Sequence, residues 1–267
     1  MQPLPPITNI NTIDDVINAI ESIINWSIAN ESRLGYFGAL YKRITIAIKQ
    51  NLPKFQDPAR MERLDVTFAS RYFAALNAWF WPAQYSPLSQ CWRVAFQAAA
   101  LPKPIIIQHL LAGVNAHINL DLGIAAAETS PGAELPSLQS DFNLVNEVLA
   151  NEVAGVLDEI DELSPVLAEL YDVFSKFETD IIDHMLEFTR EEAWSFAVLL
   201  APLDAQQQAV EIAKRDVFVA GVGAQIITPP ALFDAIIDAI ALLETRDVVK
   251  IIETLNAQAN AVAARTV

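Results

Sequence analysis

Residues Pro104–Ala127 read PIIIQHLLAGVNAHINLDLGIAAA, and this stretch decides what kind of fold the chain can form. Drawn as a helix it is apolar almost all round, which predicts a helix buried on every side. Buried polar groups need hydrogen-bond partners. We therefore expect a polar interior around this helix, with the functional site beside it. The polar side chains of the stretch are Gln108, His109, Asn115, His117, Asn119 and Asp121.

The polar side chains of this central helix fall into two seams at 100° per residue. Gln108, Asn115 and Asn119 lie within about 40° of one another and form what we call the amide seam. His117 and Asp121, one turn apart on nearly the opposite side, form the imidazole seam. A helix with two polar seams needs neighbouring helices on both sides.

The rest of the chain repeats apolar residues at helical spacing, without strand alternation or internal repeats. Thr12 and Asp57-Pro58 predict helix starts, because these residues satisfy or remove the first free backbone N–H groups. Ser140-Asp141 predicts another start, after a long loop over residues 128–139. We expect an all-α fold, an orthogonal bundle of about ten helices around the buried central helix. Residues 1–10 are a lead, and residues 11–267 form a single domain.

Composition excludes several partners. The net charge of −16 argues against binding to nucleic acid or to an anionic membrane. The single cysteine, Cys91, rules out an internal disulfide and multi-cysteine zinc sites. The N-terminal residues show no secretory signal, and the polar second half of the central helix argues against membrane insertion. We expect a soluble, cytoplasmic protein.

His117 and Asp121 stand at positions i and i+4, so their side chains can meet. A carboxylate on one imidazole nitrogen fixes the tautomer and raises basicity, which prepares a general base. The same pair can also be a buried hydrogen bond that only specifies packing, or part of a metal site. The residues alone leave these three interpretations open.

A divalent metal ion would need ligands from a second helix. Asp180 and His184 form another i, i+4 pair, in reversed order. The candidate ligands are therefore His117, Asp121, Asp180 and His184. Several acidic residues surround His184, however, and they equally predict a solvated acidic face.

Further polar and aromatic residues are candidates for substrate binding. Asn115 and Asn119 could anchor a ligand or bond a neighbouring chain, and Tyr72 suits an apolar pocket wall. Asp65 is expected to form an internal salt bridge with Arg63 or Arg71. No phosphate-binding loop, dinucleotide-binding glycine pattern or serine-hydrolase elbow is found. The residues assigned to substrate binding are Asn115, Asn119, Asp65, Tyr72, Asp141 and Asn146.

The order of motifs resembles a family of mainly bacterial all-α proteins catalogued as a domain of unknown function. Its most specific segment is QHLLAGVNAHINLDL, residues 108–122. Shorter matches accompany it along most of the chain: Gly35-Tyr36-Phe37, Leu40-Tyr41, Arg60-Met61, Leu64-Asp65-Val66, Phe68-Ala69, Arg71-Tyr72, Trp92, Ala95-Phe96, Asp141, Asn146 and Ala193-Trp194.

The resemblance implies a helical fold and one polar cluster, but no activity. The cluster would comprise Asp65, Arg71, Asn115, His117, Asn119, Asp121, Asp141 and Asn146. Our leading hypothesis is an enzyme that acts on an apolar small molecule by general-base or metal-assisted chemistry. The alternative is a non-catalytic helical scaffold that binds a protein or a lipid-like ligand.

Overall fold

The helix starts follow from side chains that satisfy free backbone N–H groups. In the computed structural model, which describes residues 2–164 and 181–264, Thr12 Oγ1 accepts from Asp15 N at 3.1 Å. Asp15 Oδ2 in turn accepts from Thr12 N at 3.0 Å, which completes a capping box. Asp57 Oδ1 accepts from Arg60 N at 3.0 Å, with Pro58 as the first helical residue. Both predicted starts are confirmed.

The fold is all-α, and the described residues contain no strand. Three short 3₁₀ turns, η1 (Leu52–Lys54), η3 (Gly132–Glu134) and η4 (Ala231–Phe233), connect longer helices. The α-helices are α1 (Ile13–Ala29), α2 (Leu34–Asn51), α3 (Pro58–Phe80), α4 (Gln90–Ala99), α5 (Ile106–Ala116), α6 (Gly123–Thr129), α7 (Leu135–Leu163), α9 (Ile181–Leu200), α10 (Ala205–Ile227), α11 (Asp234–Leu243) and α12 (Val248–Ala264).

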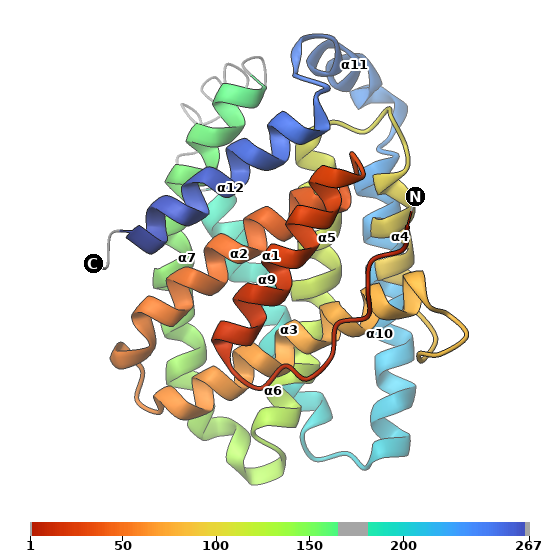
Figure 1. Ribbon diagram of the computed structural model, residues 1–267. Helices are drawn as coiled ribbons and strands as arrows, with labels where there is room; N and C mark the ends of the chain where they lie inside the picture. Colours follow the sequence, from red (N-terminus) through yellow and green to blue (C-terminus); the bar gives the residue numbers. More distant parts are fainter. Residues whose placement is uncertain (1, 165–180, 265–267) are drawn as a thin grey trace.

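The helices wrap around the central element formed by α5 and α6 (Figure 1). Helix α2 packs between α1 and α12 on one side of it, and α10 packs against α4 and α5 on another. Helices α3 and α9 pack against α6. Most buried apolar side chains, from Leu4 to Leu255, form one contiguous core. The central helix therefore has neighbours on both of its polar seams.

The central element is the one described helix that is long and apolar enough to cross a bilayer. It spans Ile106–Thr129, and 78% of its apolar window is buried inside the protein. The core helix of a soluble protein has this property. Gly113 permits the closest approach, because a Cβ there would lie 2.6 Å from the Phe37 ring. The burial of the helix thus depends on side chains from α2 that touch its backbone.

The predicted loop over residues 128–139 is much shorter in the structure. Helix α6 continues to Thr129 and α7 already begins at Leu135, after the turn η3. The predicted N-cap at Ser140-Asp141 is therefore wrong, since both residues lie inside α7. The prediction failed because aspartate often caps the start of a helix, whereas the Asp141 side chain accepts hydrogen bonds from a different segment of the chain.

Candidate active site

The polar second half of the central helix is wound as a π-helix. The segment His117–Leu122 (η2) connects α5 to α6 without a break in helical backbone conformation. The sequence predicts an uninterrupted α-helix here, so the 100° spacing fails beyond residue 116. A π-turn joins each N–H to the fifth preceding carbonyl, is rare, and frequently occurs at functional sites. This wider turn contains both members of the imidazole seam.

Asp121 is the hub of the imidazole seam and accepts hydrogen bonds from three helices. Its Oδ2 lies 3.2 Å from His117 Nδ1 and accepts from Trp92 Nε1 at 2.8 Å. Its Oδ1 accepts from Arg71 Nε at 3.1 Å. The side chain is almost completely buried. Because an ionised carboxylate can only accept, this arrangement places the proton of His117 on Nδ1.

The imidazole of His117 is enclosed by aromatic rings. It stacks on Phe68 with ring centroids 3.5 Å apart, and Tyr41 and Phe37 meet it edge to face at 4.7 and 5.7 Å. Burial lowers the pKa of His117, and the hydrogen bond that its Nδ1–H donates to the charged Asp121 opposes this shift only in part. The imidazole is therefore neutral near pH 7, with its lone pair on Nε2.

The buried polar atoms without a hydrogen-bond partner among the described residues include His117 Nε2, Oη of the adjoining Tyr41, and Oδ2 of Asp65, whose charge acts on Tyr41. Burial raises the pKa of Asp65 to about 7, and the charge of Glu62 adds to the shift. Burial and the charges of Asp65 and Asp121 raise the pKa of Tyr41. Buried polar atoms are rarely left unpaired, so these atoms indicate a position for water or a ligand.

The predicted salt bridge of Asp65 is wrong. Arg71 pairs instead with Asp121 and, through Nη1 at 3.5 Å, with Glu128. Asp65 forms no ion pair with any described residue, including Arg63. Spacing along α3 suggested the pairing, but the nearest strong acceptor for Arg71 lies on another helix.

The rings of Phe37, Tyr41, Phe68, Tyr72 and Trp92 surround His117, and we call them the aromatic wall. Tyr72, which the sequence predicts to line an apolar pocket, is part of this wall. Its ring stacks on Trp92 at 5.0 Å and meets Phe37 edge to face at 5.1 Å. Burial raises the pKa of its hydroxyl. Tyr72 thus remains neutral and contributes shape rather than charge.

The amide seam faces α10, and its side chains bond protein groups. Asn115 Nδ2 donates to Val219 O at 2.9 Å, and Gln108 Nε2 donates to Ile226 O at 2.6 Å. Asn119 Nδ2 donates to Asn115 Oδ1 at 3.0 Å. Asn115 therefore bonds a neighbouring helix, which is one of the two roles that the sequence left open for it, whereas the Asn119 side chain bonds Asn115 within the central helix.

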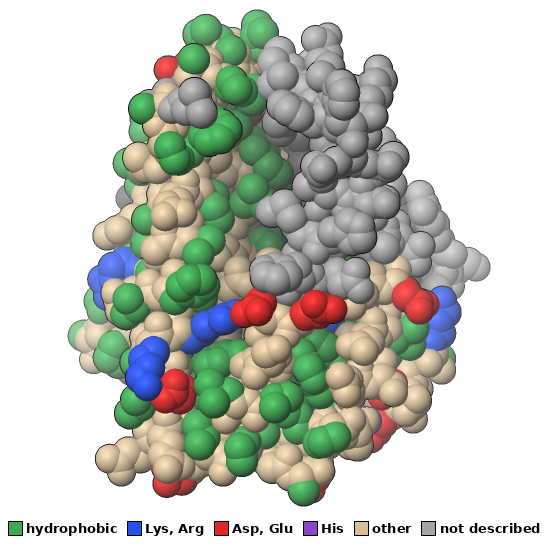
Figure 2. All heavy atoms as spheres, turned by 180° about the vertical axis from the view of Figure 1, so that it is seen from behind, with side chains coloured by type: hydrophobic (Ala, Val, Ile, Leu, Met, Phe, Trp, Pro, Cys, Tyr) green, Lys and Arg blue, Asp and Glu red, His purple; other side chains and the backbone are tan. Residues whose placement is uncertain are grey.

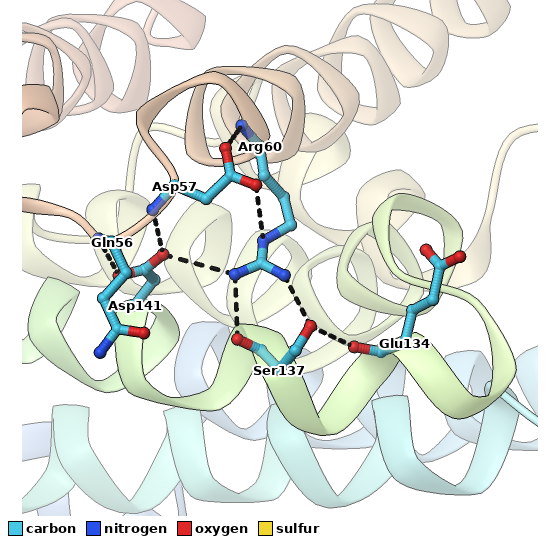
Figure 3. A network of polar contacts seen from close by, with 6 residues as sticks. All are labelled: Gln56, Asp57, Arg60, Glu134, Ser137 and Asp141. Carbon is cyan, nitrogen blue, oxygen red and sulfur yellow. Dashed lines mark hydrogen bonds and ion pairs between the residues drawn. The ribbon is translucent and has the colours of Figure 1, made fainter.

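Asp141 and Asn146 have different partners, and Figure 3 shows the network of Asp141. Asp141 accepts from the backbone N–H groups of Gln56 at 2.7 Å and Asp57 at 3.0 Å, and it lies 3.6 Å from Arg60. It thereby fixes the chain just before α3. Asn146 accepts from Arg190 Nε. The eight residues implied by the resemblance therefore do not form one cluster.

The predicted metal ligands are only partly described. Asp180 lies outside the described residues, and of His184 only the backbone, within α9, is described. Within the described part of the chain, no group of three or more His, Cys, Asp or Glu side chains is arranged to hold a metal ion. Cys91 is buried, and burial raises the pKa of its thiol, so it is no ready nucleophile.

Two small cavities lie in this part of the protein, and only the larger adjoins the aromatic rings around His117. One, of about 20 Å³, is lined by Phe37, Tyr72 and Trp92 together with Arg33 and His109. The other, of about 10 Å³, also contacts Arg33 and His109. Neither is lined by His117, and the larger one is separated from it by Phe37, Tyr72 and Trp92. Each has room for about one water molecule.

Two residues of the site had no role in our reasoning from the residues alone. Trp92 donates to Asp121, and Tyr41 places an unpartnered hydroxyl beside His117. Only the resemblance named them. Their periodic, apolar surroundings mark them as core residues, and no local signal shows which core residue also makes a polar contact across helices.

The comparisons with known proteins identify a family but no activity. No curated protein and no solved structure shows a significant match to the chain. A family model described as a family of unknown function (DUF5995) matches residues 13–229. This match covers well over half of the chain and includes the central helix and the whole imidazole seam. The chain therefore belongs to this family of unknown function.

Proposed function

We propose that the protein is an enzyme that uses His117 as a general base on a small, largely apolar molecule. One observation carries the proposal: His117 Nδ1 is held by Asp121, while Nε2 is buried and unpartnered. A general base needs a free lone pair, a fixed tautomer and a partner that stabilises the imidazolium formed. The imidazole seam has all three properties.

The neighbouring residues take roles that suit this chemistry. Arg71 and Trp92 orient Asp121, which in turn orients His117. Asp65, whose pKa is raised to about 7, keeps its proton in about half of the molecules at neutral pH, and in this form it could return a proton to the product. The aromatic wall favours an apolar substrate and excludes water, which strengthens the electrostatic interactions inside. The reaction class is proton abstraction, from a hydroxyl, a bound water or an acidic C–H group.

Charge and burial support one part of the proposed cellular setting. The net charge of −16 and the buried central helix favour a soluble protein that neither inserts into a membrane nor binds nucleic acid. A bacterial source rests on the resemblance alone, and a cytoplasmic location is proposed with it. A metal-assisted variant of the mechanism would recruit Asp180 and His184 to the imidazole seam. Metal analysis of the purified protein separates this variant from metal-free base catalysis.

A scaffold function is the second candidate, favoured by exposed apolar side chains on the C-terminal helices. Figure 2 shows hydrophobic side chains along the side of the molecule formed by α10 and α11. Phe218 on α10 is 62% exposed, and Leu242 and Leu243 at the end of α11 are 83% and 65% exposed. Such surface suits a protein or lipid-like partner.

The deciding experiment measures chemistry and protonation together. Purified protein is incubated with a bacterial small-molecule extract, and mass spectrometry identifies compounds that it consumes. We expect His117→Gln to slow consumption by about 10²–10⁴-fold, the usual contribution of a general base. Nitrogen NMR should find the wild-type His117 neutral at pH 7, protonated on Nδ1, with a pKa below 6.5.

The control is Asp141→Asn, a buried polar substitution in a separate network, which should leave consumption unchanged. Melting temperatures of all variants show whether a loss of activity is a loss of folding. Equal consumption by wild type and His117→Gln, or a His117 proton on Nε2, would contradict the general-base function. No consumption of any compound by the wild type would favour the scaffold.

A further inference from the structure

The π-turn η2 needs support from outside the central helix. In an α-helix each carbonyl accepts from the N–H four residues ahead, and in a π-turn it accepts from the N–H five residues ahead. Where the helix returns from the second pattern to the first, two carbonyls compete for one N–H group. Backbone polar groups inside a protein are almost always paired, so one of the two carbonyls needs a donor from another element. Such a donor also fixes the residue at which the turn ends.

Arg215 on α10 supplies a donor of this kind. Its Nε donates to the carbonyl of Asn119 at 2.9 Å, and Asn119 lies within η2. Because the guanidinium is charged, this hydrogen bond is stronger than one between neutral groups. The other end of the guanidinium faces α9, where Nη1 lies 3.5 Å from Glu192 Oε2. Arg215 therefore bonds the backbone of the π-turn while it is paired with a second helix.

Two aromatic rings hold the guanidinium of Arg215 in this position. Its Cζ lies 5.4 Å from the ring centroid of Phe196 and 5.7 Å from that of Phe218, within the range of cation–π contacts. Phe196 also packs on the end of the turn. A Cβ on Gly123, the first residue after η2, would lie 2.9 Å from this side chain and 2.7 Å from Ala193 O. Helix α9 thus touches the end of the π-turn and the side chain that bonds it.

The turn held in this way contains the imidazole seam. His117 is its first residue, and Asp121 lies near its end, with Oδ2 3.2 Å from His117 Nδ1. The winding of a helix sets the angle between side chains four residues apart, and a π-turn is wound differently from an α-helix. A shift of the turn along the chain would therefore rotate Asp121 relative to His117.

We propose that Arg215 is a positioning residue, which fixes the π-turn through Asn119 O and thereby keeps Asp121 in contact with His117. It acts through the backbone, because Asn119 lies midway between the two residues in the sequence. This inference rests on the proposed function only for the statement that the pair is catalytic. Its test uses no substrate, so a failure of the general-base function and a failure of this inference are distinguishable.

The test compares hydrogen exchange and nitrogen NMR in the full-length wild type and in Arg215→Gln, whose shorter, neutral side chain loses the charge-assisted bond. We expect the backbone N–H groups of residues 121–124 to exchange about tenfold faster or more, relative to the most protected amides of the molecule. The His117 proton, held on Nδ1 in the wild type, should become distributed over both ring nitrogens.

Arg60→Gln is the matched control. Arg60 also donates to a backbone carbonyl, that of Ser137, at 2.9 Å. Its side chain is 14% exposed against 16% for Arg215, and it likewise faces a carboxylate, that of Asp141 at 3.6 Å. Arg60→Gln should leave both the relative exchange of residues 121–124 and the His117 tautomer unchanged.

A second variant tests the inference with little risk to folding. Phe218 is 62% exposed, and Phe218→Ala removes one of the two rings that hold Arg215. We expect exchange of residues 121–124 to be about 2–5-fold faster than in Val217→Ala, an exposed neighbour on α10, as the loss of an exposed cation–π contact predicts.

Three results would overturn the inference. The first is equal relative exchange of residues 121–124 in Arg215→Gln and Arg60→Gln. The second is an unchanged His117 tautomer in Arg215→Gln. If Arg215→Gln does not fold, the third decides: equal exchange of these residues in Phe218→Ala and Val217→Ala.

Discussion

The two polar seams of the central helix use similar residues in opposite ways. In the amide seam, Asn115 and Gln108 bond the backbone of α10, and none of the seam's buried polar atoms is left unpartnered among the described residues. In the imidazole seam, Asp121 is fully engaged but His117 keeps a buried, unpartnered Nε2. The first seam is a closed network, and the second is open at one end.

The difference shows how one helix can hold a structure and present a reactive group. A closed buried network contributes net stability, whereas an unpaired buried atom costs free energy. The open end is tolerated because Asp121, Arg71 and Trp92 fix the rest of the seam. The π-turn η2 contains both members of the imidazole seam and also Asn119 of the amide seam, while Gln108 and Asn115 lie in regular α-helix. The irregular backbone therefore holds the open end of the network, and such turns frequently occur at functional sites.

The strongest test of the comparison replaces the hub of the open seam. Asp121→Asn leaves His117 and Arg71 without their shared carboxylate, and breaking such buried pairs typically costs about 3–5 kcal/mol. Because Arg71 is partly exposed and also faces Glu128, we expect the low end of this range. Urea denaturation gives the free energy of unfolding, and nitrogen NMR should show that His117 loses its fixed Nδ1–H tautomer.

Asp141→Asn is the matched control for this variant. Asp141 is as buried as Asp121, accepts two backbone hydrogen bonds and lies 3.6 Å from Arg60, but it fixes the chain before α3 (Figure 3). We expect a loss of unfolding free energy with no change in the His117 tautomer. If both variants change the tautomer, the two networks are coupled and the distinction between them fails.

The all-helical fold could be predicted because its signals are local. The caps at Thr12 and Asp57 and the apolar periodicity each depend on a few neighbouring residues, and the structure confirms them. Asp141 shows the limit: its sequence context is that of a helix cap, yet its partners are backbone groups more than 80 residues away. A local pattern cannot tell which segment a capping side chain serves.

The site could be predicted only where its residues share one helix. His117 and Asp121 were paired from their spacing, and the structure places them in contact. The donors Trp92 and Arg71 come from other helices, and the π-turn depends on how those helices pack around it. Neither these two donors nor the π-turn has a sequence pattern of its own. Tertiary packing therefore supplies the second half of the site.

A second prediction concerns the pH dependence that the open seam imposes. The pKa of Asp65 is raised to about 7 in the folded protein, above the ordinary value of 3.8. Between these values the unfolded chain loses the proton and the folded protein keeps it, so stability falls as pH rises from about 4 to 7. Asp65→Asn removes this loss. We expect its stability relative to wild type to be about 2–4 kcal/mol more favourable at pH 8 than at pH 4.

Urea denaturation at both pH values measures this difference. Asp15→Asn, which removes an exposed carboxylate at the start of α1, is the control for a general effect of removing a negative charge. Hydrogen bonds lower the pKa of Asp15, so its contribution to stability is present at high pH and lost as pH falls. The two variants should therefore show opposite signs. The same sign in both would mean that Asp65 is ionised in the folded protein.

The smallest expected effect comes from the closed seam. Asn115→Ala removes the bond to Val219 O and leaves Asn119 without its partner, so we expect a loss of about 1–3 kcal/mol. Asn143→Ala, an exposed amide on α7, should change stability by less than about 0.5 kcal/mol. The His117 tautomer and pKa should stay unchanged in both variants, since the seams face different helices. A shift of the His117 signals in Asn115→Ala would show that the π-turn transmits strain between the seams, and closed and open networks would then be parts of one unit.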